Sequence, residues 1–167
     1  YTCFMKNANA YKDIKLDPNK IVYLLKKWGT ELGFDELEVS RAELRKDKEY
    51  FNTWLQQGLQ GSMSYMERNS QKRLQPTDLI QETISIITVR STYLSASLEE
   101  TLKSLKEPTL GYLALYARGR DYHKIIRKKL KRLAESLINE IGDFGYRVFT
   151  DSAPVLERAL ARDGGLG

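Results

Sequence analysis

Asp151 is the residue whose type and position most directly suggest chemistry. It follows a β-branched run and precedes a proline and an apolar stretch in VFTDSAPVLERALA, residues 148–161. This pattern places an acid where a strand ends and a helix begins, the point at which open sheets usually gather ligands. A carboxyl group there predicts either a general acid that protonates a substrate or the N-cap of the following helix. Spacing alone leaves both open, because Asp151 or Ser152 could accept the free amide protons of the first helical turn.

A basic helix provides a second group of candidates. Seven of the 13 residues from Arg120 to Arg132 are Lys or Arg, on a helix whose other face is apolar. Such a face can bind RNA phosphates, although charge runs on long helices more often only keep them soluble. His123 falls in the first turn, where a neutral imidazole can bind a ligand or bridge to the backbone.

Arg73 lies in QKRLQP, three residues before a proline. Its fork of donors could clamp an amide or a phosphate, and an ordinary surface arginine is the alternative.

The composition limits the possible classes of protein. The chain has 167 residues, of which 41% are hydrophobic and 29% charged, with a net charge of +5. These values predict one globular domain with a mild preference for anionic partners. One cysteine, Cys3, and one histidine exclude a structural zinc site, an iron–sulfur cluster or a disulfide built from this chain alone. No apolar run approaches the roughly 20 residues of a membrane helix, and the first 19 residues do not resemble a secretory signal, so we expect a cytoplasmic location.

Two helices can be predicted in the first third of the chain. Asp17, followed by a proline, predicts the start of a helix with apolar residues at helical spacing that ends near Gly33. Ser40 with Glu43 three residues later resembles a capping box. The second helix is therefore expected to begin there and to close near residues 58–61.

Three strands are expected in the rest of the chain. Residues 83–93, TISIITVRSTY, are β-branched and nearly continuous, so we expect a central strand covered on both faces. Residues 109–119 and 146–150 are expected to form the other two strands, with a linker rich in Ser and Glu between the first and the second.

The remaining segments complete the expected architecture. Asp121 predicts the cap of a long helix, residues 154–162 a last helix, and residues 61–76 a polar loop with one helical turn. We expect residues 1–18 to form an irregular extension and residues 19–167 to form one domain. Strands alternate with helices, so the predicted class is α/β (α+β), with a single mixed sheet flanked by helices.

Four stretches together resemble the amino-terminal half of the epoxyqueuosine reductase family of tRNA-modifying enzymes. The stretches are GFDELEVS, WLQQGLQGSMSYMERNSQKRLQP, LGYLALYARGRDYHK and FTDSAPVLERALARDGGLG. The resemblance spans nearly everything from Asn19 onward. The pairing of GRDYHK with DSAPVLERALA, across a long helix, is the most specific part of it.

This resemblance implies a cobalamin-binding domain of the epoxyqueuosine reductase and reductive dehalogenase type. In full-length members a ferredoxin-like domain with two 4Fe–4S clusters follows. Such an enzyme reduces epoxyqueuosine to queuosine at the wobble position of tRNA, with electrons from an external donor. By the same resemblance, Asp151 is the proton donor to the departing epoxide oxygen and also lies against the cofactor, while Arg73 and Ala114 contact cobalamin. The residues that resemble others around this pocket are Tyr122, His123 and Arg158.

The sequence also departs from the family pattern. Leu115 replaces a usual arginine, residues 81–82 replace a usual Pro-Gly turn, and Glu38 replaces a usual glycine. The cluster cysteines are absent, so we expect a piece of a longer protein that is inactive alone. We expect tRNA as the partner, a monomer, and no membrane. The alternatives are a non-redox RNA- or nucleotide-binding module that uses the basic helix, and another cobalamin-dependent reductase.

Overall fold

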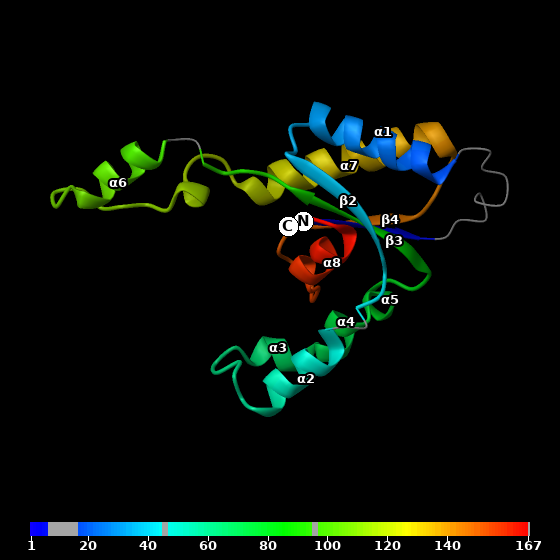
Figure 1. Cartoon of the computed structure of the whole chain (residues 1–167), viewed down its shortest axis with the longest axis horizontal. Helices are drawn as coiled ribbons and strands as arrows, with labels where there is room; N and C mark the ends of the chain where they lie inside the picture. Colours follow the sequence, from blue (N-terminus) through cyan, green and yellow to red (C-terminus); the bar gives the residue numbers. More distant parts are fainter. Residues whose placement is uncertain (7–16, 45–46, 95–96, 167) are drawn as a thin grey trace.

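The computed structural model describes residues 1–6, 17–44, 47–94 and 97–166, and it centres on a four-stranded sheet (Figure 1). The strands are β1 (Thr2–Lys6), β2 (Glu36–Arg41), β3 (Thr83–Arg90) and β4 (Tyr146–Phe149), in the spatial order β2-β3-β1-β4. Phe4 of β1 lies opposite Ile86 of β3 and Arg147 of β4. All three strand pairings are antiparallel. The predicted α/β (α+β) class is confirmed, but the sheet is antiparallel and not mixed.

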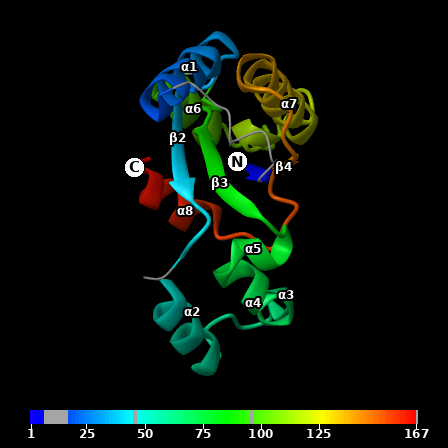
Figure 2. The ribbon, with the colours of Figure 1, turned by 90° about the vertical axis from the view of Figure 1, so that its right-hand side faces the viewer.

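The helices form layers on both faces of the sheet. They are α1 (Pro18–Glu31), α2 (Asp47–Gln56), α3 (Ser64–Arg68), α4 (Ser70–Leu74), α5 (Pro76–Leu79), α6 (Leu98–Lys106), α7 (Tyr122–Ile141) and α8 (Glu157–Gly164), with a 3-10 turn η2 (Leu115–Ala117). Helices α1 and α7 cover one face and α8 covers the other, while α2 to α5 form a lobe beyond the sheet (Figure 2). Helix α6 extends away from the body, to the left in Figure 1, whereas the lobe lies below the sheet in that view.

Alternation along the inner strands fills two separate cores. Cys3 and Met5 pack with the buried leucines of α1 and α7, whereas Phe4 between them packs with Ile86 and with Leu160 of α8. Successive side chains of a strand point to opposite faces, so β1 serves both cores. Full burial of a leucine or phenylalanine stabilises a fold by about 1.5–3 kcal/mol, which makes these two cores the main support of the sheet.

The two long helices begin and end as the sequence predicts. The Asp17 side chain accepts a hydrogen bond from the backbone N–H of Asn19 at 3.0 Å, and Asp121 accepts one from the N–H of His123 at 3.0 Å. Helix α7 ends at Gly142, whose φ of 91° suits glycine. The central position of β3 and the strand at residues 146–149 are also confirmed.

The predicted capping box is wrong. Ser40 belongs to β2, where it pairs with Ile86, and α2 begins only at Asp47. The alternation of Leu37 and Val39, which pack with the core beneath α1 and α7, is the strand signal that the capping pattern obscured.

Four other predictions also need correction. Residues 109–119 form no strand but an irregular segment with the turn η2, because they pair with no neighbouring strand in the described ranges. The expected linker contains α6, capped by Ser97. Residues 61–76 contain α3 and α4 instead of a polar loop with one turn. Residues 1–18 are not wholly irregular, since Thr2–Lys6 is an inner strand; residues 7–16 lie outside the described part of the chain.

Candidate functional site

A large cleft lies between the lobe of α2 to α4 and the segment that leads into α8. Its volume is about 1420 Å³. The side chains that make its walls largely apolar are Phe51, Trp54, Met66, Val155 and Leu156. Phe51 and Trp54 of α2 stack with ring centroids 5.9 Å apart. Asp151, Arg158 and Arg73 line the same cleft, so three of the residues predicted from the sequence meet here.

Asp151 lies in a bend after β4, and it is not a helix cap. Helix α8 starts at Glu157, with Leu156 before it and no side-chain cap, so the N-cap interpretation and the predicted helix start at residue 154 are both wrong. The backbone of Asp151 has a φ of 54°, in the left-handed region that Asp and Asn tolerate better than most residues. Its side chain is 46% exposed, so the carboxyl group is accessible from solvent.

Tyr122 and His123, at the start of α7, approach the Asp151 carboxyl group. The Tyr122 hydroxyl donates a hydrogen bond to Asp151 Oδ2 at 2.8 Å. His123 Nε2 lies 3.8 Å from the same oxygen. The hydrogen bond to Asp151, with a smaller contribution from burial, raises the pKa of Tyr122 to about 12. Tyr122 therefore remains a neutral donor that holds one oxygen of the acid.

Arg73 of α4 has donors that the fold does not use. Its Nε is buried without a hydrogen-bond partner in the described structure, and its Nη2 donates only a long hydrogen bond of 3.5 Å to the carbonyl oxygen of Tyr65. Burial lowers the pKa of Arg73 from its ordinary value. A buried guanidinium nitrogen without a partner is costly, so Arg73 carries a donor that the described contacts do not use.

Two candidates lie differently from Asp151 and Arg73. Arg158 is an exposed residue in the first turn of α8 on the cleft wall. Ala114 is half-buried before η2 and does not line the cleft. Its link to the site is indirect: it precedes η2, and the ring of Tyr116 in η2 packs against the ring of Tyr122, with 6.4 Å between the ring centroids.

Glu157 is a site residue that the sequence did not single out. It lines the cleft, and its Oε1 accepts a hydrogen bond from the Thr2 hydroxyl at 3.3 Å. Burial, opposed by the nearby positive amino terminus and reinforced by Asp151, raises the pKa of Glu157. Its position at the start of a helix favoured an ordinary exposed residue, and only the contact with β1, 155 residues away, reveals its burial.

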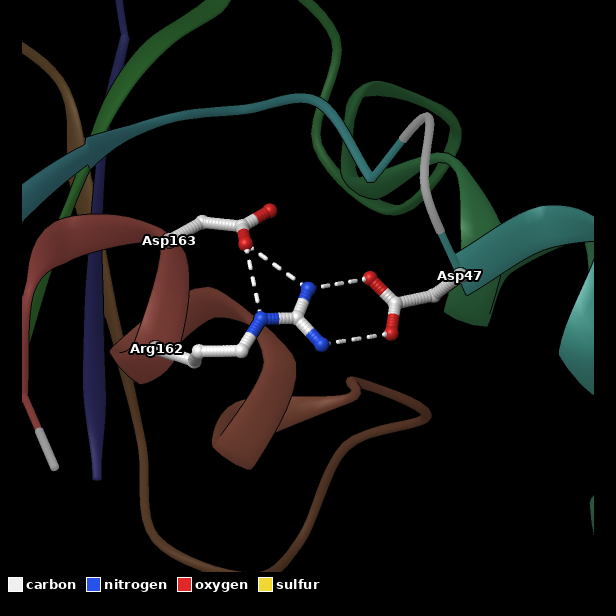
Figure 3. A network of polar contacts seen from close by, with 3 residues as sticks. All are labelled: Asp47, Arg162 and Asp163. Carbon is white, nitrogen blue, oxygen red and sulfur yellow. Dashed lines mark hydrogen bonds and ion pairs between the residues drawn. The ribbon is translucent and has the colours of Figure 1, made fainter.

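An arginine clasp joins the two walls at the edge of the cleft (Figure 3). Arg162 of α8 donates to both carboxylate oxygens of Asp47 on α2, at 3.1 and 2.7 Å, and also to Asp163 at 3.0 and 2.7 Å. Hydrogen bonds to Asp47, and then to Asp163, raise the pKa of the Arg162 guanidinium. A bidentate pair has a defined geometry, so this contact fixes where α2 stands relative to α8.

The basic face of α7 is exposed, with one exception that matters for its interpretation. Lys128 and Lys131 are exposed, whereas Lys129 is half-buried and its ammonium donates to the carbonyl oxygen of Gly33 at 3.3 Å. The same group lies 5.3 Å from the ring centre of Phe34. Lys129 thus attaches α7 to the end of α1.

No helix in the described residues is both long and apolar enough to cross a membrane.

A family model and several curated relatives that match this chain all carry the name epoxyqueuosine reductase. A family model described as epoxyqueuosine reductase QueG, DUF1730, matches residues 73–152. The chain is 42% identical to an epoxyqueuosine reductase of Pseudomonas aeruginosa over 90% of its own length and 42% of the relative's. It is 41% identical to that of Salmonella typhimurium and 40% identical to that of Escherichia coli, each over 91% of this chain, and it spans 39% and 40% of their lengths. The predicted resemblance to epoxyqueuosine reductases is confirmed, for a chain that spans about two fifths of these relatives.

Two solved structures share the fold. The epoxyqueuosine reductase from Streptococcus thermophilus superposes with a TM-score of 0.71 at 20% identity, covering 87% of this chain and 38% of that one. A selenomethionine-labelled epoxyqueuosine reductase gives a TM-score of 0.72 at 22% identity, covering 90% and 40%. At these identities the structures support the architecture alone.

Proposed function

We propose that this chain is the cofactor- and substrate-binding part of an oxidoreductase that reduces epoxyqueuosine to queuosine in tRNA. The observation that carries this proposal is identity of about 40% to epoxyqueuosine reductases across nine tenths of the chain. The cleft beside Asp151 is where we place the chemistry. Reduction also needs electrons, which we assign to two 4Fe–4S clusters and an external donor. The clusters would be held by another part of the full-length protein, because the single buried cysteine of this chain cannot hold one.

The residues of the cleft fit cobalamin as the cofactor. The cleft volume of about 1420 Å³ exceeds the roughly 300–1,000 Å³ of pockets for drug-sized ligands. Its walls combine stacked aromatic and aliphatic side chains with the unpartnered Nε of Arg73, which could donate to an amide oxygen on the rim of a corrin. When bound, cobalamin would supply a reduced cobalt centre for the opening of the epoxide. Arg73 and Arg158, which line the cleft, would hold it, whereas Ala114, which lies outside the cleft, is assigned no contact with it.

Asp151 would supply the proton. Its Oδ2 accepts the Tyr122 hydroxyl, so a proton carried by the acid belongs on Oδ1, the oxygen left for a substrate. As the epoxide carbon–oxygen bond breaks, Asp151 would transfer this proton to the oxygen and become a carboxylate. The Tyr122 hydrogen bond then stabilises the carboxylate, which lowers the cost of giving the proton away.

The exposed lysines of α7 support tRNA as the partner. Lys128 and Lys131 lie on the outer face of the helix whose first turn carries Tyr122 and His123. An RNA bound along this face could place a modified base near Asp151, and its phosphates would meet the cations. We propose a monomeric enzyme of the cytoplasm for this role.

Cofactor binding to the full-length protein provides the test. We expect added cob(II)alamin to bind saturably and to change its absorption spectrum. Arg73→Met should weaken binding about tenfold or more, since a hydrogen bond from a charged group contributes about 1.5–3 kcal/mol and each 1.4 kcal/mol is tenfold. Lys124→Met, which also removes a cation but lies outside the cleft, should bind normally. An unchanged spectrum at every concentration would contradict the proposal and favour a non-redox RNA- or nucleotide-binding module.

A further inference from the structure

We infer that Asp121 and His123 form a relay that returns a proton to Asp151 after each reaction, with Asp121 as the positioning residue. This inference rests on the proposed function, because it takes Asp151 as the proton donor. The structure places the three side chains in series, with the imidazole between two carboxyl groups.

Asp121 does more than cap α7. Its Oδ1 accepts the backbone N–H of His123 at 3.0 Å and also lies 2.9 Å from His123 Nδ1. The hydrogen bond with the His123 side chain is the main cause that lowers the pKa of Asp121. A carboxylate is an acceptor only, so the proton of this contact belongs to Nδ1. Asp121 therefore selects the tautomer in which neutral His123 leaves Nε2 unprotonated.

The other ring nitrogen faces the acid of the site. His123 Nε2 is 3.8 Å from Asp151 Oδ2, which is too long for a direct hydrogen bond but is closed by a small shift of either side chain. The ring of Tyr122 stacks on the imidazole with centroids 4.0 Å apart and 26° between planes, which restrains the orientation of His123. The other titratable groups that face this arrangement from neighbouring elements are Tyr1, Tyr116 and Glu157.

The transfer balances without any further reagent. After Asp151 has protonated the substrate oxygen, Oδ2 of its carboxylate takes the Nε2 proton of the His123 imidazolium. A half-turn of the carboxyl group then exchanges Oδ2 with Oδ1, so that the proton again faces the substrate and the unprotonated oxygen accepts the Tyr122 hydroxyl. His123 becomes neutral and keeps its Nδ1 proton on Asp121. Because the His123 side chain is 40% exposed, Nε2 can take a new proton from water. Direct entry of protons to Asp151 becomes restricted once cofactor and tRNA cover the cleft, so the side approach through His123 remains.

The arrangement does not suit a metal ion. The two carboxyl groups contact opposite nitrogens of the same ring, so the three side chains cannot converge on one ion. Within the described residues, no group of three or more His, Cys, Asp and Glu side chains is placed to hold a metal.

The tautomer of His123 can be measured directly, because ¹⁵N-labelling of this segment within the full-length protein labels a single histidine. In the full-length protein with only this residue ¹⁵N-labelled, two-bond ¹H–¹⁵N correlation at pH 9 should show the proton on Nδ1. Asp121→Asn keeps a good N-cap but removes the charged acceptor, and should increase the Nε2–H form. A proton on Nε2 in the wild type, or the same tautomer in both proteins, would overturn the inference. This measurement needs neither cofactor nor activity, so it is independent of the proposed function.

The relay itself is tested by turnover in the full-length, cofactor-loaded enzyme. We expect His123→Ala and Asp121→Asn to lower multiple-turnover rates about 10-fold, as loss of an orienting partner commonly does, and to change the pH profile. Added imidazole should restore turnover to His123→Ala but not to Asp151→Ala. Absence of rescue together with a wild-type pH profile in Asp121→Asn would refute the relay. Normal turnover by Asp151→Asn would instead refute the donor assignment of the proposed function, and the two failures are therefore distinguishable.

Discussion

The left-handed backbone at Asp151 predicts an unusual order of stability among its variants. Its φ of 54° costs an ordinary residue about 1–2 kcal/mol, whereas Asn and Asp adopt this region more readily and Gly adopts it freely. Asp151→Asn should therefore change the free energy of unfolding by less than about 0.5 kcal/mol. Asp151→Ala should be about 1 kcal/mol less stable than Asp151→Gly, although alanine is favoured over glycine in most contexts.

The comparison of Ala with Gly isolates the backbone contribution. Both variants lose the hydrogen bond from Tyr122 equally, so the difference between them reports only the conformation at residue 151. Urea denaturation followed by circular dichroism provides the measurement, with Ser152→Ala as a control at the neighbouring exposed position. Equal stability of the Ala and Gly variants would refute the reasoning, because it would mean that the fold does not impose a positive φ there.

Two further predictions concern α7. The hydrogen bond to Asp151 and burial raise the pKa of Tyr122 from its ordinary value of 10.0 to about 12. The hydrogen bond therefore contributes stability below pH 10 that is lost between about pH 10 and 12. Urea denaturation across this window should show a steeper loss of unfolding free energy in the wild type than in Tyr122→Phe. Log affinity for tRNA falls as log salt concentration rises, and Lys128→Gln and Lys131→Gln in the full-length protein should each make this negative slope less steep by roughly 0.7–0.9. Lys129→Gln should leave that slope unchanged and lower thermal stability instead, since its ammonium binds Gly33.

Local signals were sufficient to predict the long helices but not the whole sheet. Asp17 and Asp121 cap their helices through contacts within two residues, which a sequence pattern can capture. Strand β1 has only five residues and depends on pairing with β3 and β4, so its structure is decided by segments far along the chain. Residues 109–119 show the converse, since an apolar pattern typical of a strand has no partner to pair with.

The candidate site shows the same division. The position of Asp151 after a strand was predictable, but its distance from α8, which rules out the cap, is given by no local pattern. Tyr122 reaches Asp151 across 29 residues because the start of α7 lies beside the end of β4. Glu157 was missed for the corresponding reason, since its burial comes from the contact with Thr2.

The role of Asp151 as proton donor is best tested by single-turnover reduction of epoxyqueuosine-containing tRNA. The full-length Asp151→Asn enzyme should be loaded with cobalamin and chemically reduced beforehand, so that electron supply does not limit the rate. Asparagine tolerates the backbone at this position and can accept the Tyr122 hydroxyl, but it cannot donate a carboxylic proton. We predict normal cobalamin binding and a rate lower by about 10²- to 10⁴-fold, the usual contribution of general acid catalysis. A wild-type rate in this variant would contradict the assignment of Asp151 as the donor.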